Sequence, residues 1–275
     1  MATIVPLLTT FPGRAPGNGV CLFFYDAKNE YFNGGIGSAM GYSMYTGDMA
    51  YAATASGTMN GIPKAYLGIG FDVKGDFGTT NDSKPGSNVF NTTSTGISSC
   101  TYNTRAHNTI TTRAGELSSY KVLSTTPNLS TYPLSGAPLE TYGEPNLYYT
   151  ESPPVTLHQT VTSRDDVTFT RVKAIIQNGG KRIRVEIKDP ATNKYYPYQI
   201  IDLETGLGER QVPLQGITNL KVGLAFSTSE SVMNCEIKNF SVYGTYSGVP
   251  KEVGYIRPHT TAKYTVTLSA NGGCA

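Results

Sequence analysis

The chain has 275 residues, enough for one sizeable core, and its formal net charge at neutral pH is only +2. Charged residues make up 15% of the sequence and no basic block occurs, so the charge pattern expected of a protein that binds nucleic acid or anionic lipid is missing. No run of 18 apolar residues is present, and TIVPLL near the amino terminus is too short for a signal peptide. We therefore expect no nucleic-acid partner, no membrane segment and no secretory route.

Short runs rich in β-branched and aromatic residues recur along the chain, separated by clusters of Gly, Pro, Asn and Ser. No window of twelve or more residues has apolar positions at helical spacing. The pattern predicts an all-β sandwich or barrel of antiparallel sheets. In chain order, the predicted strands cover 20–26, 65–73, 108–113, 120–123, 167–177, 182–189, 195–203, 219–227, 234–244 and 262–270.

The clearest predicted hairpin joins the runs 167–177 and 182–189 through Asn178-Gly179-Gly180, because these residues accept the positive φ of a tight turn. The second run alternates apolar residues at odd positions with charged residues at even positions, so one face should pack and the other should meet solvent. Lys181, Arg182 and Arg184 form a small basic group, which we interpret as part of that solvated face rather than as a binding patch.

Residues 126–163 differ from the rest, because six prolines interrupt any strand ladder and tyrosines are spread between them. A loop of this length in a compact domain is usually functional or disordered, and the tyrosines argue against simple disorder. We expect a loop at the rim of the sandwich, with a binding role and simple packing over the sheet as equal alternatives. Its tyrosines include Tyr132, Tyr142, Tyr148 and Tyr149.

The four cysteines are widely scattered and show no spacing typical of a zinc site. Cys21 and Cys235 lie inside apolar alternating runs, where a free cysteine behaves as a small buried hydrophobe. We therefore predict reduced, structural cysteines.

Asp72 and Asp76 stand four residues apart in AYLGIGFDVKGDFG (65–78), where a predicted buried strand runs into a glycine-rich loop. Residues 17–78 as a whole run from an Asn-Gly pair through an apolar strand, a Gly-Gly-x-Gly turn and a Gly-Tyr pair to a strand that ends in Phe-Asp. Together with the runs KRIRVEIKD and NLKVGLAFS, this order resembles the L-type, legume-like lectin domain over residues 17 to about 246. The resemblance implies a concanavalin A-like jelly-roll β-sandwich.

The resemblance also implies a metal site. Plant-type members of the family use a Glu-x-Asp pair on the strand and two further ligands in the following loop to hold a transition metal and calcium. Here Gly70 stands at the glutamate position, while Asp72, Asp76 and Asn81 match the other ligands. All three are oxygen donors, which suit calcium better than a softer metal. Calcium is the implied ion, and the alternative is that Asp72 and Asp76 hydrogen-bond the backbone of a tight turn.

Sugar binding is implied at the same rim. The family's saccharide-binding aspartate corresponds to Asn18, and an amide still donates and accepts hydrogen bonds. The turn 34–37 would bring backbone N–H groups of Gly35 and Gly37 to the ligand, since glycine permits close approach. Asp76 and tyrosines of the long loop would complete the carbohydrate site, with the tyrosine rings stacking on sugar faces.

Glucan-cleaving enzymes share this architecture and need a nucleophile and an acid/base about 5 Å apart on one strand face. On the comparable face this chain has Gly70, Asp72, Lys74 and Asp76, so neither glutamate of the family's catalytic pattern is present. The three histidines show no spacing of a triad or a ligand set. We therefore predict no enzymatic activity.

Family members usually carry a longer segment before the Asn-Gly position than the seventeen residues found here. We expect a sandwich over 1–246 and a carboxy-terminal extension over 247–275, in which the strand 262–270 follows a linker and either folds back or adds to a neighbouring subunit's sheet. The prediction for function is a carbohydrate-binding or surface-recognition module of a phage or virus particle, made in the host cytoplasm. Its partners would be a glycan or host-surface polysaccharide and other virion subunits, in a homo-oligomer. The alternative is a purely structural virion protein.

Overall fold

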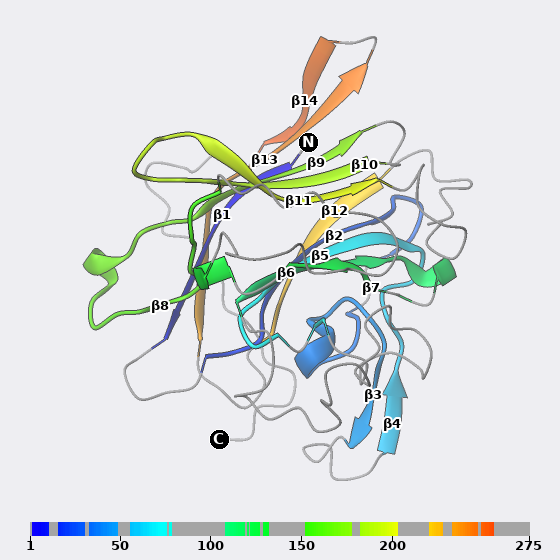
Figure 1. Ribbon diagram of the computed structural model, residues 1–275. Helices are drawn as coiled ribbons and strands as arrows, with labels where there is room; N and C mark the ends of the chain where they lie inside the picture. Colours follow the sequence, from blue (N-terminus) through cyan, green and yellow to red (C-terminus); the bar gives the residue numbers. More distant parts are fainter. Residues whose placement is uncertain are drawn as a thin grey trace.

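The structure is a computed structural model, and it shows two β-sheets stacked face to face (Figure 1). It describes residues 2–10, 16–30, 33–48, 56–75, 77–78, 108–118, 120, 122–126, 129–131, 152–177, 182–202, 220–227, 233–246 and 249–255. No described helix is long and apolar enough to cross a membrane.

The first sheet has seven strands and all but one of its neighbouring pairs are antiparallel. The exception is β8 (Gln159–Thr160), which pairs in parallel with the end of the first strand. The order of the others is β11 (Tyr195–Asp202), β10 (Arg182–Lys188), β9 (Arg171–Gln177), β1 (Ala2–Thr10), β13 (Asn234–Tyr246) and β14 (Val249–Tyr255).

The second sheet has five antiparallel strands, and a separate hairpin of β3 (Tyr45–Asp48) and β4 (Ser56–Met59) lies beside it (Figure 1). Helical structure in the described residues is confined to the short 3-10 turns η1 (Gly37–Ala39), η4 (Glu116–Ser118), η5 (Leu129–Thr131) and η6 (Arg164–Asp166). The order of the five strands is β12 (Leu220–Ser227), β2 (Gly19–Asp26), β5 (Ala65–Asp72), β6 (Thr109–Ala114) and β7 (Val122–Thr125). The predicted all-β sandwich of antiparallel sheets is confirmed.

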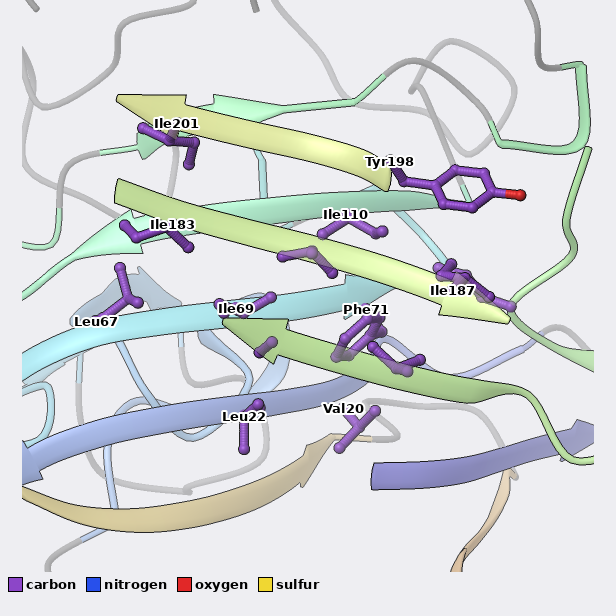
Figure 2. Close-up of a cluster of buried hydrophobic side chains, with 14 of the residues drawn as sticks. Val20, Leu22, Leu67, Ile69, Phe71, Ile110, Ile183, Ile187, Tyr198 and Ile201 are labelled. Atoms are coloured by element: carbon purple, nitrogen blue, oxygen red, sulfur yellow. The ribbon is translucent and has the colours of Figure 1, made fainter. Parts of the chain in front are cut away.

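The main core lies between the two sheets, where the apolar positions of each strand face one another (Figure 2). In β10 the odd positions Ile183, Val185 and Ile187 are at most 1% exposed, as the alternation predicts. β10 also pairs with β9 in the predicted antiparallel register, although the turn residues 178–181 lie outside the described residues. The five-stranded sheet contributes Val20, Leu22, Leu67, Ile69, Phe71 and Ile110.

Five of the described strands were not predicted: β1, β3, β4, β8 and β14. β1 occupies the middle of the seven-stranded sheet, where it pairs with β13 and β9. It contains Pro6, which the ladder tolerates because pairing with β9 covers only Ala2 to Ile4, so the missing N–H is not needed on that side. β14 lies inside the segment predicted to be a linker, so that part of the prediction is wrong, and it follows β13 as an antiparallel hairpin. The predicted strand 262–270 lies outside the described residues.

Candidate functional site

The outer face of the five-stranded sheet, opposite the main core, is the place where the sequence predicts metal and sugar ligands. In the structure this face carries a second hydrophobic cluster, formed where the segments 39–44, 60–64 and the residues at 77 and 120 cross the sheet. We call it the outer cluster. Its buried members are Cys21, Phe23, Tyr25, Met40, Tyr42, Ile62, Ala65, Phe77, Tyr120 and Ala225.

Aromatic rings of the outer cluster lie directly on glycines of β5. A Cβ atom at Gly68 would be 2.6 Å from the Tyr42 ring, and one at Gly70 would be 2.3 Å from the Phe77 ring. Tyr42 meets Phe77 edge-on with ring centroids 6.3 Å apart and meets Tyr120 edge-on at 5.5 Å, which is the favoured geometry for aromatic pairs. The glycines of LGIGFD are therefore explained by packing, because only a residue without a side chain leaves room for the rings.

Two of the three tyrosines of this cluster also hold the covering segments in place by hydrogen bonds. The Tyr42 hydroxyl donates to the carbonyl of Ala114 at the end of β6 (2.9 Å), and the Tyr120 hydroxyl donates to the carbonyl of Ile62 (2.7 Å). Both bonds are buried, and a buried hydroxyl without a partner would cost free energy. The cluster is thus closed by specific hydrogen bonds as well as by apolar contact.

Arg113 of β6 is the charged centre of this face and is completely buried. Its Nε donates to the Phe77 carbonyl (2.8 Å), one terminal nitrogen donates to the Tyr120 carbonyl (2.9 Å), and its guanidinium carbon lies 4.9 Å from the centroid of the Phe77 ring. The Arg113 side chain therefore fixes the backbone at residues 77 and 120, where the chain covers the sheet. Sequence reasoning missed it, because an arginine near the end of a predicted strand is ordinarily exposed.

Asp72 ends β5 and is also completely buried. One carboxylate oxygen accepts the N–H of Gly75 (2.7 Å), and the other accepts the N–H groups of Phe77 (2.7 Å) and Gly78 (3.3 Å). Carboxylate hydrogen bonds to backbone N–H groups are charge-assisted and stronger than neutral ones. Asp72 thereby closes the loop that carries Phe77 onto the sheet.

These contacts bear on the predicted metal site. The family's glutamate position, Gly70, is filled by the Phe77 ring, so the described residues do not fit a transition metal there. Both oxygens of Asp72 are already hydrogen-bonded to the backbone, which is the geometry of the turn-capping alternative. Within the described part of the chain no three His, Cys, Asp or Glu side chains are grouped for a metal ion. Asp76 and Asn81 lie outside the described residues, so calcium binding by them stays a prediction.

Three of the predicted sugar ligands, Asn18, Gly35 and Gly37, lie in described segments at one rim of the five-stranded sheet, whereas Asp76 lies outside the described residues. Asn18 is fully buried and its carbonyl accepts the Val73 N–H (2.8 Å). Gly35 donates its N–H to the Ser43 carbonyl (2.8 Å), and its own carbonyl accepts the Gly41 N–H (2.8 Å). The Gly37 carbonyl accepts the Ser227 hydroxyl (2.6 Å), which joins the turn to β12. A saccharide could reach Asn18 only if the covering residues moved.

Part of the long proline-rich segment is described and packs along an edge of the sandwich. The buried Asn108 donates from Nδ2 to the Val155 carbonyl (2.8 Å) and accepts the Leu157 N–H (2.7 Å). The Tyr198 hydroxyl donates to the Pro153 carbonyl. Residues 152–157 therefore pack against the sandwich, which is one of the two alternatives that the sequence left open for this loop. The four tyrosines proposed for sugar stacking lie outside the described residues.

Two ionisable groups of the outer cluster have strongly altered acidity. Burial raises the pKa of the Cys21 thiol and of the Tyr42 hydroxyl above their ordinary values of 9.0 and 10.0. For both groups the neutral form is kept in the folded protein, whereas the unfolded chain releases the protons in alkaline solution. The outer cluster is therefore a source of alkaline instability.

We expect the free energy of unfolding to be insensitive to these groups below pH about 9 and to fall above it, because the unfolded chain then binds fewer protons than the folded one. Each group that ionises only on unfolding contributes a slope of about 1.4 kcal/mol per pH unit. Urea unfolding between pH 7 and 10.5 measures the slope. Cys21→Ala should reduce it, and equal slopes in the two proteins would contradict the assignment.

Gly70→Ala should lower the free energy of unfolding by about 1–3 kcal/mol, because the new methyl group would overlap the Phe77 ring. The matched control is the same change in a Phe77→Ala background, where the space is open. Urea unfolding of the wild type, both single variants and the double variant gives the coupling between the two positions. Additive effects would show that the ring does not rest on Gly70.

Comparisons with known proteins found matches among solved structures. No protein-family model and no curated protein matches the chain. Among solved structures, peanut lectin matches at 12% identity and a TM-score of 0.39, over 86% of this chain and 66% of that one. Basic winged bean lectin with Tn-antigen matches at 14% identity and a TM-score of 0.35, over 82% and 59%. Lectin I-B4 from Griffonia simplicifolia, in its metal-free form, matches at 12% identity and a TM-score of 0.39, over 86% and 68%.

The sandwich architecture itself is established by the strand pairing of this chain. The matched region is less than two thirds of the peanut lectin chain and of the winged bean lectin chain. At these identities the likeness concerns the fold alone, and the contacts of the outer cluster are features of this chain.

Proposed function

We propose that this chain is a non-catalytic carbohydrate-binding or surface-recognition module. The observation that carries the proposal is a rigid, outward-facing turn at the rim of the five-stranded sheet. Two N–H groups, of Gly34 and Gly35, bond to the segment 41–43 (2.9 and 2.8 Å), while Ile36 at the tip is 48% exposed. A loop held in one conformation binds a ligand at a lower entropic cost. Recognition loops on a rigid sandwich are a common arrangement.

The proposed contact surface is the tip of this turn, and the sequence adds Asp76 and the tyrosines of the long loop to it. Ile36 would supply apolar contact with a sugar ring, and the hydroxyls would be bound by polar groups around it. Asn18 would hold the loop behind the turn through its bond to Val73. Because both oxygens of Asp72 accept backbone N–H groups, we propose that recognition here does not depend on calcium bound by Asp72.

A glycan array with the purified chain, in calcium and in EDTA, tests this proposal. Ile36→Ser should weaken the signal without changing the unfolding midpoint, because the side chain lies at the exposed tip. Leu117→Ser is the matched control, since Leu117 is 70% exposed in η4 and is not part of the turn. Loss of signal in both variants, or no signal for the wild type, would overturn the proposal.

A purely structural role is the second candidate, and the burial at the rim favours it. Asn18 is 0% exposed, and the N–H groups of Gly34 and Gly35 are used inside the protein. In this role β14, at the edge of the seven-stranded sheet, would contact neighbouring copies of the chain. Mass measurement by light scattering tests it: a defined oligomer together with an empty glycan array would support the scaffold.

The finer proposal is that the module is a component of a virus or phage particle, as a fibre, spike or capsid decoration. Its support is the sequence composition and the β13–β14 hairpin, which extends away from the body of the sandwich (Figure 1). An antibody against the chain should label purified particles in electron micrographs. Labelling only of soluble material from the same lysate would contradict the particle role.

A further inference from the structure

The outer face of β9, β10 and β11 concentrates positive charge. Alternate residues of β9 and β10 point into the main core, so the remaining positions lie on the opposite side of the seven-stranded sheet. The cations on these positions are Arg171, Lys173, Arg182, Arg184 and Lys188, and we call them the basic face.

The strand register places these cations in one patch. Lys188 is paired with Arg171, and Glu186 is paired with Lys173, so four charged residues form a block across two neighbouring strands. Neighbouring strands lie about 4.8 Å apart and alternate residues of one strand about 7 Å apart. The cations from 182 to 188 therefore follow β10 over roughly 20 Å.

Few carboxylates balance this charge. Glu186 lies between Arg184 (2.6 Å) and Lys173 (3.5 Å), and its side chain is only 8% exposed. Asp202 of β11 is paired in register with Arg182. Among the side chains described on this face, five cations thus accompany one acid, Glu186, whereas the whole chain has a net charge of only +2. From the sequence, Lys181, Arg182 and Arg184 are interpreted as part of a solvated strand face. That interpretation does not include the cations that β9 adds to the same face.

The structure also restrains the cations. The Lys173 ammonium lies 3.8 Å from the centroid of the Tyr195 ring, and the Lys188 ammonium lies 5.9 Å from it. The side chains of Lys173 and Arg184 are 22% and 38% exposed, and both are held by Glu186. Side chains that are already ordered lose less entropy when a ligand binds.

We propose that the basic face binds a carboxylate-bearing polysaccharide laid across β9 and β10. A sheet surface accommodates an extended chain, and a guanidinium group such as that of the exposed Arg171 matches a carboxylate in a two-point geometry. A low net charge on the whole chain gives little long-range attraction to nucleic acid. The choice of a glycan rests on the proposed function, but the surface is separate from the turn at 33–37.

The test is binding of the intact chain to polygalacturonate at 20 and 300 mM NaCl, with neutral dextran and a DNA duplex as comparison probes. The double variant that combines Arg171→Glu and Lys188→Glu should weaken polygalacturonate binding about tenfold or more. Lys28→Glu with Lys64→Glu is the matched control, because it makes the same change in net charge at two exposed residues beside the five-stranded sheet. It should leave binding unchanged, and unfolding midpoints confirm that both variants fold.

No binding of the wild type, or an equal loss in both double variants, would overturn the basic face as a site. DNA bound as tightly as polygalacturonate, with the same loss in the first variant, would overturn the glycan and assign the face to nucleic acid. The Ile36→Ser variant separates this proposal from the function proposed above. It should bind polygalacturonate normally even if its array signal for neutral glycans is lost.

Discussion

Arg113→Ala should lower the free energy of unfolding by about 3–5 kcal/mol, the range expected when a buried charged group is removed from its partners. The guanidinium donates to the carbonyls of Phe77 and Tyr120 and lies over the Phe77 ring. Its removal leaves two buried acceptors without these donors and opens a cavity under the covering segments.

Urea unfolding monitored by tyrosine fluorescence measures this loss. Arg171→Ala is the matched control, since Arg171 is exposed on the other sheet and its removal should have a far smaller effect. Equal stability of the two variants would show that Arg113 does not hold the covering segments.

Asp72→Ala should lower the free energy of unfolding by about 3–4 kcal/mol, because three backbone N–H groups in a buried loop lose their acceptor. Asp72→Asn should lower the free energy of unfolding by a smaller amount, since one oxygen remains as an acceptor. It should still be less stable than the wild type, because its NH2 group would oppose a backbone donor. The same unfolding experiment measures both variants.

Asp189→Ala is the matched control for this prediction. Asp189 accepts the N–H groups of Ala191 (3.0 Å) and Thr192 (3.1 Å) in a similar turn, but it lies in an exposed position. Hydrogen bonds there compete with water, so a much smaller loss is expected. A comparable loss for Asp189 and Asp72 would contradict the importance of the buried loop.

The sequence predicted the strands that follow a regular apolar pattern, and the structure confirms β2, β5, β10 and β12. It did not reveal β1 or β14, because Pro6 and Pro250 argue against a strand unless the pairing partner of each position is known. Pro250 lies in β14 at the edge of the sheet, where one side of the strand needs no ladder bonds.

The candidate site was only partly predictable. The missing glutamate at Gly70 was visible in the sequence, but the group that takes its place, Phe77, depends on how the loop after Asp72 turns back over the sheet. The roles of Arg113 and Tyr42 depend on partners distant in the sequence, at 77, 120 and 114. Local spacing carries no signal for such contacts.

The central claim is that the outer face is a closed cluster in which Asp72 caps a loop. Thermal unfolding tests it most directly. The wild type and Asp72→Asn are each measured in 2 mM calcium and in EDTA. A ligand that binds only the folded state must raise the apparent stability. We predict the same midpoint for the wild type in both buffers and a lower, equally calcium-independent midpoint for Asp72→Asn. A rise of the wild-type midpoint in calcium that Asp72→Asn abolishes would contradict the account and assign Asp72 to a metal site.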